Sequence, residues 1–165
     1  MTGVFVLLGI GSNINRETNI KNALFDLKNA FGEIKISPVY ESEAAFFRGA
    51  PFFNLVVCLH TLLDIPSLFS TLREIEHKHG RQRTKEKYTP TTLDIDILTY
   101  GDFCGVEASI ILPRKELTVQ PYVLRPLAEL CPNTIHPLLK KSYQQLWCEH
   151  EHYKNDGLKL IVLNQ

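Results

Sequence analysis

The hydrophobic positions of this chain recur with two periods, and the segments that they mark alternate along its amino-terminal part. A period of two, or an unbroken apolar run, is typical of strands, whereas steps of three and four positions are typical of helices. Asp64 before Pro66 has the signature of a helix start, and Gly32 and Gly80 follow helical stripes as stops. The predicted strands are residues 4–8, 34–36, 52–63 and 93–97, and the predicted helices between them are residues 20–31 and 64–80.

This order, β-α-β-β-α-β, is the ferredoxin-like arrangement. Residues 41–51 lack periodicity and predict a loop, and the glycine-rich stretch 9–13 predicts a tight turn rather than a phosphate-binding loop. The sequence contains no repeat and no low-complexity linker, so we expect a single α+β domain over residues 1–165, a sheet with helices packed on it. Further predicted elements are strands at 110–112 and 158–163 and a short helix at 123–130.

Composition narrows the class of protein. The chain has 165 residues, of which 44% are hydrophobic and 22% charged, as in ordinary soluble domains. Lys plus Arg and Asp plus Glu number 18 each, which argues against a nucleic-acid partner bound by bulk charge. No apolar run reaches the roughly 20 residues of a bilayer span, and the four cysteines form no CxxC pair. We therefore expect a cytoplasmic protein with reduced thiols and without a membrane partner.

Asp94 and Asp96 are the first candidate for chemistry. They lie two positions apart on a predicted strand, so both carboxylates point to one face, with Cα atoms roughly 6.5 Å apart. Two carboxylates this close repel each other unless a cation lies between them, and magnesium accepts one or two carboxylates with water and phosphate oxygens. The alternative for this pair alone is a solvated polar face of an amphipathic strand.

The loop before this strand is the most basic part of the chain. Residues 81–87 read Arg-Gln-Arg-Thr-Lys-Glu-Lys, four cations and one anion. Such a loop beside a pair of carboxylates suits a polyphosphate–metal complex, because guanidinium groups neutralise the phosphate oxygens that the metal does not contact. A solvated charge run remains the alternative reading of the loop by itself. The sequence contains neither GxxxxGK nor GxGxxG, which disfavours a P-loop or a dinucleotide-binding fold.

Asn54 is a polar amide within an apolar strand. A buried amide needs hydrogen-bond partners, which here are either neighbouring backbone or a planar heterocycle that uses both its donor and its acceptor. Aromatic residues that could stack on such a ring include Phe52, Phe53, Tyr88 and Tyr122.

Several motifs resemble the 6-hydroxymethyl-7,8-dihydropterin pyrophosphokinase family of folate biosynthesis. The most specific are Arg81-Gln82-Arg83 followed by Thr92-Leu93-Asp94-Ile95-Asp96-Ile97-Leu98 and Tyr100-Gly101. The similarity covers most of the chain, and its other motifs are Leu8-Gly9 with Gly11-Ser12-Asn13, Phe53-Asn54, Glu76 with Gly80-Arg81, Leu112-Pro113, Tyr122-Val123-Leu124, Pro126-Leu127, Glu129 and Pro132.

The resemblance implies a ferredoxin-like α/β/α sandwich with a mixed or antiparallel sheet, ATP as co-substrate, a pterin alcohol as acceptor, and two Mg²⁺ ions held by Asp94 and Asp96. The implied catalytic residues are Arg81, Arg83, Asp94 and Asp96. The residues implied for the pterin are Ser42, Ala44, Asn54, Tyr88 and Tyr122. Those implied for ATP are Glu76, Arg81, Arg83, Ile97, Leu112 and Arg114. A monomer is expected.

Three positions depart from the family pattern. Thr91 and Gln120 stand where the family has arginine, and Arg114 stands where it has histidine. Loss of one charge-assisted hydrogen bond to phosphate, about 1.5–3 kcal/mol, slows turnover roughly ten- to a hundredfold. Arg114, Lys85 or Lys87 is the candidate replacement for the missing charge.

Two alternatives to an active pyrophosphokinase follow from these observations. The departures leave open a paralogue that binds pterin or nucleotide with lost or altered activity. A ferredoxin-like RNA-binding or regulatory domain is the other alternative, although zero net charge and a single basic loop speak against it.

Overall fold

A computed structural model describes residues 3–43, 49–82 and 90–164 of the chain. The elements, in chain order, are β1 (Val4–Ser12), α1 (Arg16–Phe31), β2 (Ile34–Ile36), β3 (Val39–Ser42), β4 (Phe52–Thr61), α2 (Ile65–Lys78), β5 (Asp94–Tyr100), β6 (Gly105–Glu107), β7 (Ile110–Leu112), α3 (Glu116–Val119), α4 (Pro121–Leu130), α5 (Tyr143–Cys148) and β8 (Lys159–Ile161).

One six-stranded sheet organises the described residues. Its strand order is β5-β1-β4-β3-β8, and β2 also pairs with β4. Every pairing in it is antiparallel, including the long ladders of β1 with β4 and with β5. The expected β-α-β-β-α-β order is therefore present, with β3 and β8 as additional strands.

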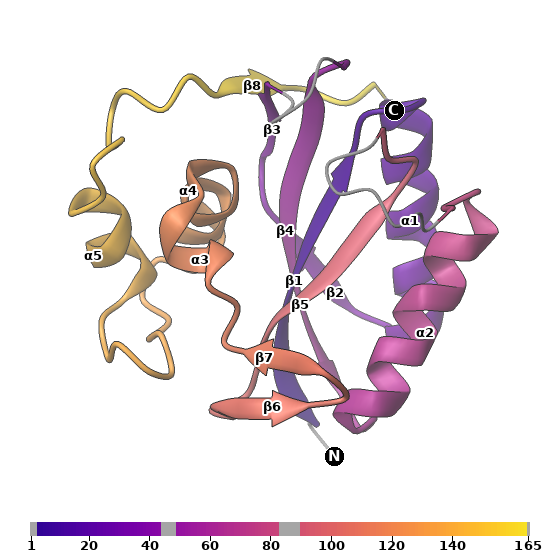
Figure 1. The fold of residues 1–165 in the computed structure, drawn as a ribbon, viewed down its shortest axis with the longest axis horizontal. Coiled ribbons are helices and arrows are strands. Elements are labelled where there is room, and N and C mark those ends of the chain that lie inside the picture. The colour runs from indigo at the N-terminus through magenta and orange to yellow at the C-terminus, as the bar shows by residue number, and fades with distance from the viewer. Residues whose placement is uncertain (1–2, 44–48, 83–89, 165) are drawn as a thin grey trace.

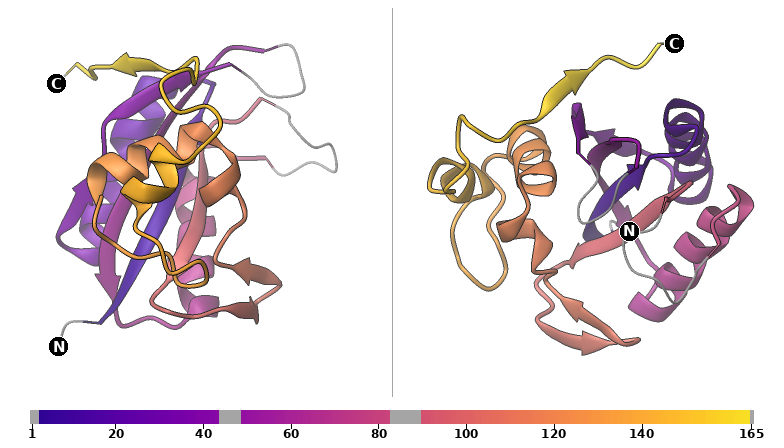
Figure 2. Two further views of the ribbon diagram at one scale, coloured as in Figure 1. Left: turned by 90° about the vertical axis from the view of Figure 1, so that its left-hand side faces the viewer. Right: turned by 45° about the horizontal axis from the view of Figure 1, so that its top comes forward.

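Helices cover both faces of this sheet (Figure 1). Helices α1 and α2 lie on one face, and α3, α4 and α5 lie on the other, as the turned views in Figure 2 also show. Each interface has its own core: Ile20, Leu27 and Leu72 belong to the first, and Leu124 and Leu127 to the second. The expected α+β, ferredoxin-like α/β/α sandwich is confirmed.

The structure corrects several predicted boundaries. The turn expected at residues 9–13 is mostly strand, because β1 continues through Ser12. The loop expected at 41–51 begins inside β3. Pro121, expected to precede a helix, occupies the first turn of α4, where its missing N–H has no intrahelical role, and Pro126 lies inside that helix. The short elements β3, β6, α3 and α5 were not predicted. Among the described residues, no helix is both long enough and apolar enough to cross a membrane.

Candidate active site

The two candidate metal ligands lie on β5 and share one face of the sheet. Asp94 pairs with Gly11 of β1, and Asp96 pairs with Gly9. Both carboxylate residues are half-buried, whereas Ile95 between them is buried in the core under α1 and α2. The strand period thus places Asp94 and Asp96 on the face that α3, α4 and α5 cover.

Asn54 completes a row of residues across three strands. Gly11 pairs with Asn54 on β4 and with Asp94 on β5, so the three residues lie side by side on the same face. Adjacent strands are about 4.8 Å apart, which puts the Asn54 and Asp94 backbones roughly 10 Å from each other. Gly11 has no side chain and is buried between the amide and the acidic pair, and a Cβ atom added to Gly9 would lie 3.3 Å from the Leu98 side chain.

The Asn54 side chain is buried and oriented by β3. Its Nδ2 donates to Ser42 Oγ at 2.7 Å and to the Tyr40 carbonyl at 3.4 Å. A Cβ atom added to Gly11 would lie 3.3 Å from Asn54 Oδ1 and 3.6 Å from Phe52 Cδ1, so this oxygen and the Phe52 ring both border Gly11. The predicted pterin residues Ser42 and Asn54 are therefore brought together, with the acceptor oxygen of the amide toward Asp94.

Burial and mutual repulsion act together on the acidic pair. Desolvation raises the pKa of Asp96 well above its ordinary value, and the neighbouring Asp94 carboxylate raises it further. Arg114 opposes this effect and lowers the pKa of Asp96. A divalent cation between the carboxylates would relieve the same repulsion, so the donor set fits Mg²⁺, which needs only one or two carboxylates from the protein. The described residues contain no cluster of three or more His, Cys, Asp or Glu side chains that could hold a metal.

Arg114 joins the site from the segment that follows β7. Its backbone N donates to the Leu98 carbonyl at 2.9 Å, and its Nε donates to Glu116 Oε2 at 3.0 Å. Burial acts to lower the pKa of the guanidinium, but the charges of Asp96, Glu116 and Asp94 raise it overall. Arg114 is thus a cation held beside the acidic pair.

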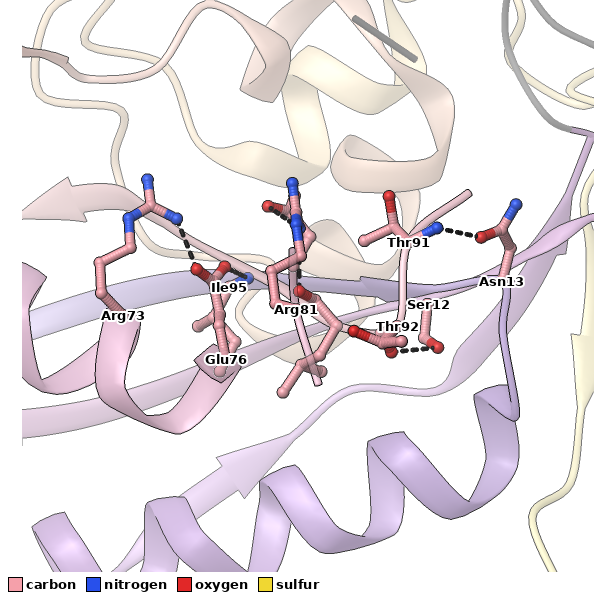
Figure 3. Close-up of polar contacts among 10 residues, drawn as sticks. Ser12, Asn13, Arg73, Glu76, Arg81, Thr91, Thr92 and Ile95 are labelled. Carbon is pink, nitrogen blue, oxygen red and sulfur yellow. Dashed lines mark hydrogen bonds and ion pairs between the residues drawn. The ribbon is translucent and has the colours of Figure 1, made fainter. Parts of the chain in front are cut away.

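Glu76 and Arg81 connect α2 to the strand that carries the acidic pair (Figure 3). Glu76 is 1% exposed, and its Oε2 accepts from the Ile95 backbone N at 2.7 Å while its Oε1 accepts from Arg73 at 2.6 Å. Burial raises the pKa of Glu76 to about 7. Arg81 Nη1 donates to the Leu93 carbonyl at 2.9 Å and to Asp94 Oδ1 at 3.2 Å. Glu76 therefore supports β5 from its outer edge, and Arg81 contacts a predicted metal ligand directly.

Ser12 and Asn13, at the end of β1, fix the segment that enters β5 (Figure 3). Ser12 Oγ donates to the Thr92 carbonyl at 2.6 Å. The Thr91 backbone N donates to Asn13 Oδ1 at 2.6 Å, and the Asn13 backbone N donates to the Thr91 carbonyl at 3.0 Å. Asn13 Nδ2 also donates to the Ala50 carbonyl at 3.1 Å. The end of β1 therefore holds the chain just before both β4 and β5.

The remaining predicted residues divide into three groups. Ala44, Arg83 and Tyr88 lie outside the described residues. Tyr122, in the first turn of α4, packs against the core on the site face. The side chains of Ile97 and Leu112 belong to the core under α1 and α2, so only their backbones can take part in binding ATP.

The three departures from the family pattern occupy different places. The Arg114 side chain pairs with Glu116, and its charge also acts on Asp96. Thr91 is buried and is bonded through its backbone to Asn13. Gln120 precedes α4, where its carbonyl accepts from the Val123 and Leu124 N–H groups.

The sequence did not indicate how the residues around the acidic pair hold one another. Ser12 and Asn13 hold the segment that enters β5, and the Tyr40 carbonyl accepts from the Asn54 amide. The Gly-x-Gly-Ser-Asn pattern after an apolar run matches the family, but its local interpretation as a turn was wrong. A separate cavity of about 490 Å³ lies at the opposite end of β1, lined by Phe5, Lys35 and His60 among others.

The comparisons with known proteins agree on one family. The profile of 7,8-dihydro-6-hydroxymethylpterin-pyrophosphokinase (HPPK) matches residues 7–132. A 2-amino-4-hydroxy-6-hydroxymethyldihydropteridine pyrophosphokinase of Synechocystis sp. is 35% identical over 143 residues, which cover 85% of this chain and 73% of that protein. The protein of the same name from Aquifex aeolicus is 34% identical, with 85% of this chain and 88% of that protein covered.

Longer relatives and solved structures agree with this family. The chain spans 32% of a folate synthesis bifunctional protein of Chlamydia caviae, to which it is 32% identical. A crystal structure of Plasmodium falciparum HPPK-DHPS with pterin and p-hydroxybenzoate superposes with a TM-score of 0.76 at 15% identity, over 98% of this chain and 47% of that one. That structural likeness shows a shared fold. The sequence matches show that the chain belongs to the 7,8-dihydro-6-hydroxymethylpterin-pyrophosphokinase family.

Proposed function

We propose that this protein transfers pyrophosphate from Mg-ATP to the hydroxymethyl group of 6-hydroxymethyl-7,8-dihydropterin and releases AMP, as a step of folate biosynthesis. The family implies ATP as the co-substrate. One observation carries the proposal: the antiparallel register places the Asn54 amide, Gly11 without a side chain and the Asp94 carboxylate in one row. An amide suited to a heterocycle thus lies next to a pair of carboxylates suited to a metal–polyphosphate complex.

In this proposal the pterin ring lies over Gly11 of β1, beside Phe52. Asn54, oriented by Ser42, hydrogen-bonds the ring, and Tyr122 stacks on it from α4. Tyr88 and the backbone of Ala44 are proposed to complete the ring's environment.

Asp94 and Asp96 are proposed to hold two Mg²⁺ ions. Bound Mg²⁺ supplies charge neutralisation at the phosphate oxygens of ATP. Arg81 and Arg114 add guanidinium groups from two sides of the pair, and Arg83 is proposed to join them. Glu76 holds the backbone between the two carboxylates, so that it acts on ATP binding through β5.

The proposed reaction is an in-line attack of the pterin hydroxymethyl oxygen on the β-phosphorus of ATP. Positioning of the two substrates and neutralisation of phosphate charge supply most of the acceleration. No described side chain is assigned as a general base.

AMP release in the presence of the dihydropterin alcohol and Mg-ATP tests this function, with Asp96→Ala as the inactive comparison. We expect pterin-dependent AMP from the wild-type protein and a loss of at least about a hundredfold in the variant. Wild-type AMP no higher than that of Asp96→Ala would remove the claim. Tight binding of both substrates without product would point instead to a paralogue with altered activity.

An RNA-binding domain of this topology would need an open, aromatic sheet face. Helices α3, α4 and α5 cover the corresponding face here (Figure 1). We further propose that the chain acts on small molecules as a cytoplasmic monomer formed by one domain over residues 1–165.

A further inference from the structure

The C-terminal tail, residues 156–164, lies beyond the part of the chain that the family profile matches, which ends at residue 132. It nevertheless contributes a strand to the sheet. Strand β8 pairs with β3 through Val39 with Ile161, Tyr40 with Leu160 and Glu41 with Lys159. In Figure 1 the tail crosses from α5 over the end of the sheet toward α1, and there the Asn164 backbone N donates to Glu17 Oε1 at 2.9 Å.

Strand β3 carries Ser42 and lies between β8 of the tail and β4, which carries Asn54. It has four residues, and its other edge pairs with β4 through Tyr40 with Asn54 and Ser42 with Phe52. Ser42 Oγ and the Tyr40 carbonyl are both acceptors for Asn54 Nδ2. A shift of β3 would therefore move both groups that orient the amide.

An ion pair between Asp156 and Arg125 links the tail to the residue that lies over the Tyr40 ring. Asp156 Oδ2 lies 2.8 Å from Arg125 Nη1 of α4, and the Asp156 side chain is 8% exposed. The Arg125 guanidinium lies over the Tyr40 ring, 4.5 Å from its centroid, and the Tyr40 hydroxyl donates to Glu129. Tyr40 itself is 2% exposed. The path from the tail to the amide is thus Asp156, Arg125, Tyr40 and Asn54, in continuous contact.

Asp156 also shapes the entry into β8. Its Oδ1 accepts from the Leu158 backbone N at 2.9 Å, one residue before the strand begins. One oxygen of the Asp156 carboxylate therefore holds Arg125 over Tyr40, and the other oxygen holds the start of β8.

We infer that Asp156 and Arg125 are positioning residues for the pterin subsite: they hold β3 so that Ser42 and Asn54 present the amide to the ring. This inference rests on the proposed function. Strand β8 is far from the acidic pair in the sheet, since β3, β4 and β1 lie between β8 and β5. Pterin affinity should therefore depend on the tail, whereas nucleotide affinity should not.

The test compares Asp156→Asn with Glu149→Gln in the full-length protein. Glu149 also lies beyond residue 132. It pairs with Lys141 at 2.9 Å, both side chains are exposed, and neither residue belongs to β3 or β8. Calorimetry would measure binding of a nonhydrolysable ATP analogue with Mg²⁺, and then of 6-hydroxymethylpterin to that complex. We expect Asp156→Asn to weaken pterin binding about tenfold and to raise the pterin KM without lowering kcat, with nucleotide affinity unchanged. Glu149→Gln should match the wild type in every measurement.

The outcomes distinguish the inference from the proposed function. A wild-type protein that binds no pterin contradicts the function itself. Wild-type pterin affinity in Asp156→Asn overturns the positioning role, and so does an equal loss of pterin and nucleotide affinity, because that indicates a general disturbance. If Asp156→Asn does not fold, Arg125→Lys provides the same comparison, since it keeps the charge over Tyr40 but loses the planar fork toward Asp156.

Discussion

Gly11 lies between the amide of Asn54 and the carboxylate of Asp94, where any side chain would stand on the proposed floor for the pterin. In Gly11→Ala the new Cβ would be 3.3 Å from Asn54 Oδ1, so the amide must shift by a few tenths of an ångström. We expect a rise of about tenfold in the pterin KM and little change in nucleotide affinity. Steady-state kinetics with each substrate varied in turn measures this. A larger rise in the KM for ATP would contradict the arrangement.

Arg114 is the one departure from the family pattern whose charge is seen to act on the acidic pair. Its charge lowers the pKa of Asp96, so it favours the ionised carboxylate that a metal requires. Arg114→Ala should reduce kcat/KM for Mg-ATP about ten- to a hundredfold. Lys115→Ala, an exposed cation at the next position, is the matched control and should behave as the wild type. Equal effects of the two variants would show that only overall charge matters.

Strand period was sufficient to predict that Asp94 and Asp96 share one face of β5, and the structure places Asn54 on the same face. Their roles in binding remain predictions. The sequence did not indicate the contacts of Tyr40 and Asn13, because these contacts involve α4 and residues that are distant in sequence. No local pattern marks a buried tyrosine as the neighbour of a candidate binding residue.

At the scale of elements, Glu76 is the link between helix α2 and the outer edge of β5. Burial raises its pKa from 4.5 to about 7, so the folded protein binds a proton there more tightly than the unfolded chain does. The free energy of unfolding of the metal-free protein therefore falls as pH rises from about 4.5 to about 7 through this group. We expect Glu76→Gln to flatten that fall, measured by urea denaturation across this pH range.

Glu74→Gln is the control for this measurement. It removes an exposed carboxylate from the same helix, and the pH dependence should remain that of the wild type. An unchanged slope in Glu76→Gln would mean that the buried carboxylate stays ionised throughout the range.

The long elements were predictable and the short ones were not. The strands β1 and β4 and the helices α1 and α2 have enough residues for a period to be visible in the sequence. Strand β3 follows Pro38 and has only four residues, including Glu41, and its strand conformation depends on pairing with β4 and β8. Helix α5 has six residues and is similarly defined by packing, with Tyr143 and Trp147 buried against its neighbours.

At the scale of the whole molecule, the sheet separates two hydrophobic cores, and the proposed site lies on the side of only one of them. Leu27 belongs to the core under α1 and α2, and Leu127 to the core on the site face; both are fully buried. Truncation of either to alanine should lower the free energy of unfolding by about 2–5 kcal/mol. We expect only Leu127→Ala also to weaken pterin binding under native conditions, because α4 carries Tyr122.

Urea denaturation and calorimetry on both variants check this expectation. Loss of pterin affinity in Leu27→Ala, at a temperature where that variant is fully folded, would show that the two cores are not independent.

The glycine between Asn54 and Asp94 has a consequence for inhibition. In the proposed arrangement, a planar inhibitor and the natural substrate would lie against the same backbone atoms of Gly11. A mutation that adds atoms there to exclude the inhibitor would exclude the substrate as well. Drug resistance is therefore expected to arise at the rim of the site, where the two molecules can differ, and not on its floor.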